Sequence, residues 1–158
     1  MGNDLSRSRI GAIVVLLILL LGQFAYGGRV LADTNTLLLK TEHQDLVLTI
    51  EIADTSAERS LGLMHREELP PLHGMLFDFN RATSVGMWMK NTVIPLDMLF
   101  INEQGEIRFI KQDAVPGSEV PIFSPEPVRA VLELAAGFVK DHGVKVGDQV
   151  RHPLFDGN

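Results

Sequence analysis

Short apolar runs separated by turn residues dominate the chain beyond its first 35 residues. The first two runs, at 36–41 and 46–53, flank a polar turn at 42–45 and predict an antiparallel hairpin. Further strand-length runs stand at 75–79, 85–89, 96–101, 107–111, 129–134 and 146–151. This spacing predicts roughly eight strands, and hence a fold that is mostly β.

Two short helices are expected between these strands. Thr55 and Glu58 match a capping box, in which a hydroxyl and a carboxylate satisfy free amides at the start of a helix. That helix should end near Met64. A second helix is expected between Gly137 and Gly143, because glycine commonly ends helices. The predicted fold class is α+β, mainly antiparallel β: a small barrel or sandwich with two short helices.

The N-terminal residues form a different pattern. Arg7 and Arg9 precede an apolar run at 10–21, which is typical of an export signal and short for a membrane span. We predict that residues 1–32 are a Sec-type signal peptide and that residues 33–158 form a single globular domain, periplasmic or secreted. The alternative is an uncleaved anchor with the domain facing the periplasm. The membrane would then be contacted only through this N-terminal segment.

Composition narrows the possible chemistry. The chain has no cysteine, which excludes disulfides, thiol nucleophiles and thiolate metal sites. Without residues 1–32 the chain keeps 11 basic and 19 acidic residues, a net charge of −8. Such a surface repels nucleic acid. We therefore expect no nucleic-acid partner. We also expect a monomer, with a small molecule as a possible partner.

Four motifs carry a resemblance to a known family. They read GLMHREELPPLHGMLFDF, MWMKNTVIPLDMLFI, VLELAAG and VKVGDQV. Together they resemble the bacterial domain-of-unknown-function family 192 from about Leu38 to Val150. The resemblance implies the fold of that family and no reaction, because the family has no established activity. The matched positions are Gly62, Gly74, Trp88, Lys90, Asn91, Pro95, Asp97, Glu133, Gly137, Gly147 and Asp148.

Two carboxylates stand in strongly apolar strands. In the run 96–101, alternation places Asp97 on one face with Leu99 and Ile101. Glu133 stands in a similar setting in the run 129–134. An isolated buried carboxylate is protonated or paired. The cations that could pair with Glu133 are Lys90, Arg59, Arg108 and Arg129.

The segment around Trp88 adds an aromatic and a cationic side chain. Alternation places Trp88 and Lys90 on one face and Met87 and Met89 on the other, so a cation–π contact is expected. Arg59, on the first predicted helix, could point to a carboxylate or to solvent.

These residues allow two interpretations. In the first, Lys90 and Asp97 form a structural ion pair that fixes the strand register. In the second, the polar groups form a pocket for a small polar molecule. The candidate pocket residues are Trp88, Lys90, Asn91, Asp97, Glu133 and Arg59.

Metal and enzyme signals are sparse. Met87 and Met89 leave Cu(I) binding as a weaker alternative, because thioethers favour Cu(I). The histidines lack zinc-ligand spacing, and we expect no other metal and no cofactor. No catalytic motif is present, so we lean against an enzyme. The leading hypothesis is a small polar-ligand binding module of the cell envelope. The alternatives are an envelope-acting hydrolase or lyase that uses Asp97 and Glu133 as paired carboxylates, and a structural or interaction protein with no pocket.

Overall fold

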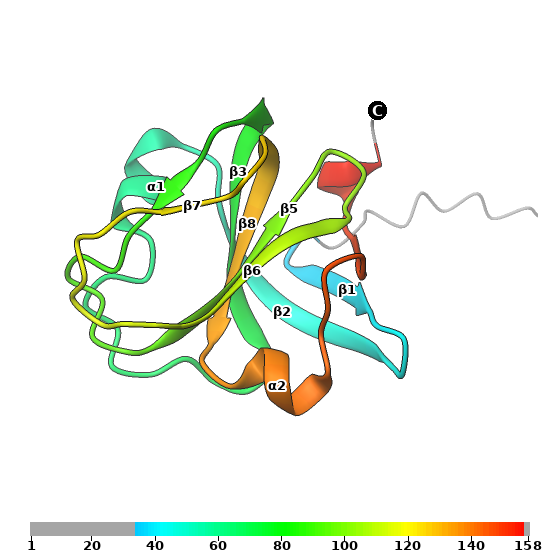
Figure 1. The fold of residues 1–158 in the computed structure, drawn as a ribbon, viewed down its shortest axis with the longest axis horizontal. Coiled ribbons are helices and arrows are strands. Elements are labelled where there is room, and N and C mark those ends of the chain that lie inside the picture. Colours follow the sequence, from blue (N-terminus) through cyan, green and yellow to red (C-terminus); the bar gives the residue numbers. More distant parts are fainter. Residues whose placement is uncertain (1–33, 157–158) are drawn as a thin grey trace, which may run out of the picture. The chain divides into compact units, whose positions relative to one another are not determined.

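The computed structural model describes residues 34–156, so the predicted signal peptide at 1–32 lies outside the described residues. Within the described part, nine strands form two sheets (Figure 1). The large sheet has the order β6-β5-β8-β3-β2-β1-β9, and the small one pairs β4 with β7. The strands are β1 (Thr36–Lys40), β2 (Asp45–Ala53), β3 (His73–Thr83), β4 (Gly86–Met87), β5 (Leu96–Ile101), β6 (Ile107–Ala114), β7 (Ile122–Phe123), β8 (Val128–Ala135) and β9 (Gln149–Arg151).

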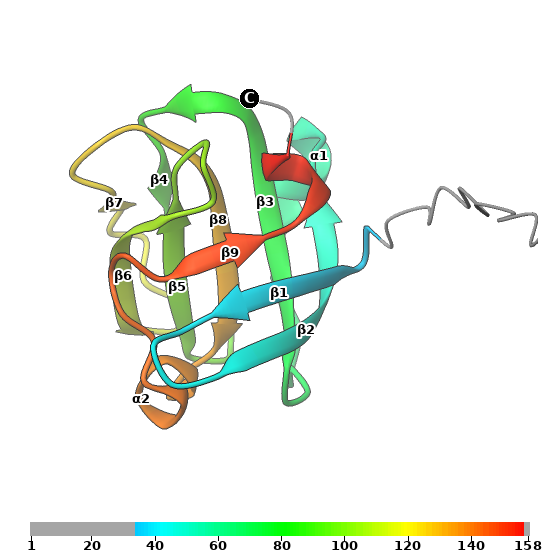
Figure 2. The same cartoon turned by 90° about the vertical axis from the view of Figure 1, so that its right-hand side faces the viewer.

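The large sheet curls into a half-barrel (Figure 2). Its strands pair antiparallel except for β2 and β3, which run parallel. The two edge strands, β6 and β9, meet at one end. There the amide of Ile107 donates to the carbonyl of Asp148 at 2.9 Å, and the amide of Val150 donates to the carbonyl of Gly105 at 2.7 Å. The predicted α+β class with a mainly antiparallel, barrel-like sheet is confirmed.

The two helices stand where they were expected. Helix α1 (Ser56–Leu61) begins at the predicted capping box, in which the Thr55 hydroxyl accepts from the Glu58 amide and the Glu58 carboxylate accepts from the Thr55 amide. It ends before Met64, because Gly62 takes a φ of +48°. Helix α2 (Phe138–His142) lies between Gly137 and Gly143, and a 3-10 turn η1 (Pro153–Phe155) follows β9.

One predicted strand is much shorter than its apolar pattern suggests. Only two residues of 85–89 pair as β4, because the chain then turns away from the ladder. The Met89 amide donates to the Ser118 carbonyl at 2.9 Å, and Asn91 has a φ of +55°. The connection at 115–121 between β6 and β7 contains Pro116 and Pro121, and we call it the proline-rich connection. Through Ser118 it holds this segment from outside the sheet.

The core has two layers, one on each face of the curled sheet. The leucine cluster lies on the face that α2 covers, and the methionine cluster lies on the face that α1, β4 and β7 cover. The buried residues of the leucine cluster are Leu37, Leu39, Leu46, Leu48, Ile50, Leu76, Leu99, Ile101, Ile107, Ala130, Leu132, Leu134, Phe138, Val139, Val144, Val150 and Phe155. Those of the methionine cluster are Ala53, Leu63, Met75, Phe77, Val85, Met87, Met89, Leu96, Met98, Phe100, Ala114, Val128 and Val131.

Candidate functional site

Glu133 lies in the middle of the large sheet, on the methionine-cluster face. It stands on β8 directly opposite Met75 of β3 and Met98 of β5. Directly paired residues share a face, so both methionines flank its side chain. Only 4% of the residue is exposed.

The carboxyl group of Glu133 has no protein partner. Across residues 34–156 no hydrogen bond or salt bridge reaches it, and burial raises the pKa of this carboxyl to about 8. Burial therefore favours the neutral carboxylic acid form of Glu133. In that form it offers one O–H donor together with acceptor oxygens.

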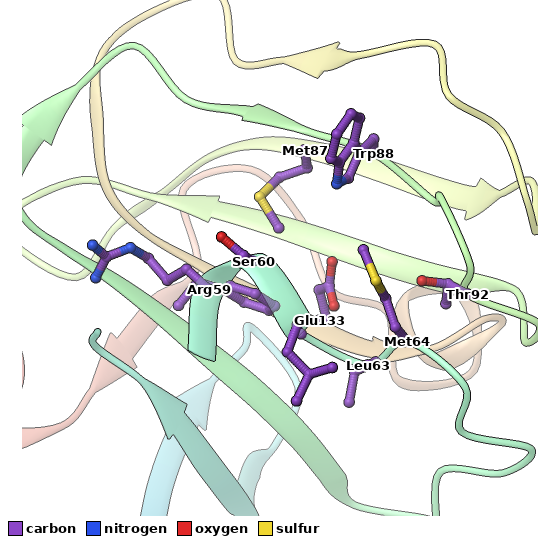
Figure 3. A pocket seen from close by; sticks show the side chains of 11 residues that line it. Arg59, Ser60, Leu63, Met64, Met87, Trp88, Thr92 and Glu133 are labelled. Atoms are coloured by element: carbon purple, nitrogen blue, oxygen red, sulfur yellow. The ribbon is translucent and has the colours of Figure 1, made fainter. Parts of the chain in front are cut away.

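A small cavity of about 20 Å³ adjoins Glu133 (Figure 3). A volume of this size holds roughly one water molecule or one group of similar size. The lining residues come from α1, the segment after it, β3, β8 and the segment 87–92. They are Arg59, Ser60, Leu61, Gly62, Leu63, Met64, Phe77, Met87, Trp88, Thr92 and Glu133.

Helix α1 and residues 62–64 cover this cavity, and we call them the roof. No residue of α1 is buried, although Leu63 just after it is. Beyond the roof, the amide of His65 donates to the carbonyl of Asn91 at 2.9 Å. Arg66 then forms a bidentate pair with Glu51. The roof is thus fastened mainly at its ends.

Arg59 fastens the other end of the roof. Its guanidinium donates to the carbonyls of Asp54 and, at 2.7 Å, of Asp78, and it lies 5.6 Å from the ring centre of Phe79. Figure 3 shows this group pointing away from Glu133. Arg59 therefore does not point to Glu133; it holds α1 against Asp54, which follows β2, and against Asp78 of β3, and its charge helps to lower the pKa of Asp78.

Trp88 and Lys90 make the predicted contact. The Lys90 ammonium lies 5.5 Å from the Trp88 ring centre, and it also lies 3.7 Å from the carboxylate of Glu119. Trp88 is 48% exposed and lines the cavity. Lys90 and Asn91 instead line a separate, open groove of about 420 Å³ beside the proline-rich connection.

Asp97 belongs to the opposite face of the sheet. It is fully buried, and its carboxylate accepts hydrogen bonds from the amides of Asp113 at 3.0 Å and Val139 at 2.9 Å. The second bond caps the first turn of α2, whose N-cap Gly137 has no side chain to do so. The proposed Lys90–Asp97 ion pair does not form.

Asp97 and Glu133 do not form a carboxylate pair either. Asp97 is paired with Leu134, the neighbour of Glu133 on β8. Successive side chains of a strand point to opposite faces, so the two carboxyl groups are separated by the sheet. The geometry required for a hydrolase with these two residues is absent.

None of the four predicted cations pairs with Glu133. Lys90 and Arg59 have the partners described above, and Arg108 pairs with Glu126 and Glu106. Arg129 forms a bidentate pair with Asp78, with a 2.7 Å bond from Nε. The prediction was wrong because these side chains find partners on their own face or edge of the sheet.

The Asp78–Arg129 pair was not anticipated from the sequence. Burial alone would raise the pKa of Asp78, but the Arg129 guanidinium and the Asn80 amide outweigh it, so the pKa lies below its usual value. Both side chains are largely buried. The pair ties β3 to β8 where their regular register ends.

The predicted site residues are therefore divided among three places. Arg59, Trp88 and Glu133 line one cavity, Lys90 and Asn91 line the neighbouring groove, and Asp97 lies on the far face. The other side chains of the lining were not predicted from the sequence; they belong to Ser60, Leu61, Leu63, Met64, Phe77 and Thr92. No local pattern marks them, because the fold alone brings them to Glu133.

The methionines named for Cu(I) are also separated. Met87 lines the cavity, whereas Met89 is fully buried in the methionine cluster and does not. Met64, which the sequence analysis did not single out, lines it as well. Within residues 34–156, no group of three or more His, Asp or Glu side chains comes together at a metal-binding spacing.

Fold and site together define a small α+β half-barrel protein with an unpartnered buried carboxyl group. The family model DUF192, described as Uncharacterized ACR, matches residues 38–152. The chain therefore belongs to the DUF192 family. A search of curated proteins found no significant match.

Solved structures that are similar to this chain include the following two. One is a candidate transcription regulator from Sinorhizobium meliloti 1021, with 49% identity, a TM-score of 0.74, and coverage of 75% of this chain and 93% of that one. The other is a protein of unknown function from Novosphingobium aromaticivorans DSM 12444, with 38% identity, a TM-score of 0.72, and coverage of 73% and 83%. In the described part of this chain, no helix has the length and apolar character needed to cross a membrane.

Proposed function

We propose that this protein is a small-ligand binding module and that its ligand contacts Glu133. The observation that carries this proposal is the buried carboxyl group, which faces a cavity and has no partner among the described residues. A buried polar group without a hydrogen bond costs stability. A ligand that supplies the missing partner recovers that cost and gains affinity from it.

The size of the cavity limits what binds without movement. A volume of about 20 Å³ takes one polar group or a single ion. A larger molecule can insert only one end, or must displace the roof. Since α1 has no buried residue, lifting the helix exposes little of its own apolar surface. Ligand entry past α1 is therefore the proposed route.

The single tryptophan of the chain gives a direct test. Trp88 lines the cavity, so its indole N–H resonance reports on occupancy. Small alcohols, amides, carboxylic acids and metal ions would be added one at a time to the full chain. We expect at least one probe to shift this resonance saturably, and we expect Glu133→Leu to abolish the shift.

A matched control uses an exposed carboxylate near the same tryptophan. Glu119→Gln removes the salt bridge to Lys90 but leaves the cavity intact, so the ligand-induced shift should persist. The proposal fails if no probe moves the indole resonance, or if the shift survives in Glu133→Leu.

We also propose that the domain acts outside the cytoplasmic membrane. The pattern of Arg7, Arg9 and the apolar run 10–21 supports export. The mass of the mature N-terminus checks this proposal. A species that begins near residue 33 supports secretion, an intact Met1 in the membrane fraction supports anchoring, and an intact Met1 in the cytosol contradicts both.

The remaining candidates have less support. The hydrolase hypothesis loses its basis because Asp97 and Glu133 lie on opposite faces. The description of the Sinorhizobium relative as a transcription regulator is not carried over, because the acidic composition of this chain disfavours nucleic acid.

A further inference from the structure

The methionines are distributed unevenly between the two faces of the sheet. The described residues contain five, and four of them belong to the methionine cluster: Met75, Met87, Met89 and Met98. The fifth, Met64, lines the cavity at Glu133. The larger leucine cluster has none. All described thioethers thus lie on the face that holds the unpartnered carboxyl group.

Two of these thioethers reach the cavity itself. Met64 comes from the roof and Met87 from β4, and both line the cavity together with Glu133. In Figure 3 their side chains extend toward Glu133 from two sides. Met75 and Met98 flank Glu133 on the neighbouring strands. The Met64 sulfur also accepts a hydrogen bond from the side-chain amide of Asn91 at 3.8 Å, which a bound ion would displace. The cavity is therefore lined by two thioether side chains and one carboxyl group around a space for a single small occupant.

We propose that this cavity is a site for one thiophilic monovalent metal ion of the Cu(I) type, held by the Met64 and Met87 sulfurs and the Glu133 carboxylate. The inference rests on the proposed function and names its ligand class. Soft thioethers favour Cu(I), and a single ion suits the size of the cavity. On binding, the ion replaces the carboxyl proton of Glu133, which passes to solvent.

The cationic groups near the cavity have partners of their own. The only other charged residue of the lining is Arg59, whose guanidinium is bound to the carbonyls of Asp54 and Asp78. Lys90 lies beside Glu119. The Trp88 ring at the cavity offers a further attractive surface to a cation. Ca²⁺ and Mg²⁺ do not suit the site, since they require about six oxygen ligands.

Titration with Ag(I), a redox-stable substitute for Cu(I), tests the proposal through Trp88 fluorescence. The full chain should show saturable quenching at one equivalent. Met87→Leu and Met64→Leu each remove one sulfur while keeping an apolar side chain of similar volume. Each should weaken Ag(I) binding by roughly tenfold or more, as loss of metal-site support commonly does.

Met89→Leu is the matched control, because Met89 is buried in the same cluster but does not line the cavity. Its Ag(I) affinity should equal that of the unchanged protein, and thermal melts should show that all three variants fold. The proposal is overturned if Ag(I) does not bind, or if the cavity variants bind it as well as Met89→Leu does.

The same titrations distinguish failure of the proposed metal site from failure of the proposed ligand binding at Glu133, on which the metal site rests. Saturable shifts of the Trp88 indole by a neutral probe, without Ag(I) binding, would overturn the metal site and leave ligand binding at Glu133 standing. Absence of any response to metal or organic probes would overturn both.

Discussion

Two buried carboxyl groups on neighbouring strands have opposite environments. Asp97 on β5 and Glu133 on β8 are both almost inaccessible to solvent, and their positions in the ladder differ by one residue. Asp97 faces the leucine cluster and accepts two backbone amides. Glu133 faces the methionine cluster, where no described residue bonds to it. Burial alone therefore does not tell a structural carboxylate from a candidate binding group.

The hydrogen-bond partners make the difference. The bonds of Asp97 join β5 to the end of β6 and to the start of α2. Glu133 joins nothing and costs the fold stability. A group that costs stability and supports no neighbour points to a role outside the fold.

The largest expected effect is that of removing Asp97. Asp97→Ala leaves the buried amides of Asp113 and Val139 without acceptors, so we expect the free energy of unfolding to fall by roughly 3–5 kcal/mol. Urea denaturation measures this. Asp45→Ala, which breaks an exposed pair with Lys40, should cost less than about 1 kcal/mol. Equal effects of the two variants would contradict the structural role of Asp97.

Glu133, in contrast to Asp97, should lower the free energy of unfolding at neutral pH, and the size of this effect should depend on pH. Its pKa rises from 4.5 in the unfolded chain to about 8 in the fold, so the folded state keeps a proton that the unfolded state loses. The contribution of Glu133 to the free energy of unfolding should therefore be most favourable below pH 4.5 and become less favourable as pH rises to about 8. Compared with Glu133→Gln, which does not titrate, the loss between pH 4.5 and pH 8 should be roughly 4 kcal/mol. A difference between the two proteins that does not change between pH 4.5 and 8 would contradict the account.

Asp78 provides the reverse case, a carboxylate with good partners. Its lowered pKa means that the stability it contributes is present above its unfolded value of 3.8 and is lost as pH falls below it. Asp78→Asn breaks the bidentate pair with Arg129 and should lower the free energy of unfolding at pH 7 by roughly 2 kcal/mol. Acid unfolding, followed by circular dichroism, measures this. Below pH 4, the stability of Asp78→Asn should depend less on pH than that of the unchanged protein does.

The smallest expected effect concerns the roof of the cavity. Thr55→Ala removes the hydroxyl of the capping box and should cost about 1 kcal/mol of stability. Ser56→Ala serves as control, because the Ser56 hydroxyl is not part of the capping box. Hydrogen exchange should show faster opening of α1 in Thr55→Ala alone. Equal exchange in both variants would mean that the cap does not hold the roof.

Local patterns predicted much of the fold. The first hairpin, the capping box, helix α2 and the fold class follow from alternation, turn residues and glycine, all of which act over a few positions. The parallel pairing of β2 with β3 and the contact between β6 and β9 were not predicted. They depend on chain segments far apart in the sequence, for which no local signal exists.

The sequence predicted several individual residues of the candidate site, but it did not predict how they are arranged in space. A glutamate in an apolar strand marked Glu133 as exceptional, and the aromatic–cation pattern marked Trp88 and Lys90. The partners of Asp97 are backbone amides, which carry no sequence signature. Met64 reaches Glu133 only through the placement of the roof.

The most direct test of the account is a carbon-detected NMR titration of the Glu133 carboxyl in the metal-free protein, with Glu133→Gln used to assign the resonance. We expect a midpoint near pH 8, because the carboxyl group is buried without a partner. A midpoint near 4.5 would show that Glu133 is solvated or paired in solution, and would contradict the claim that it stands ready for a ligand.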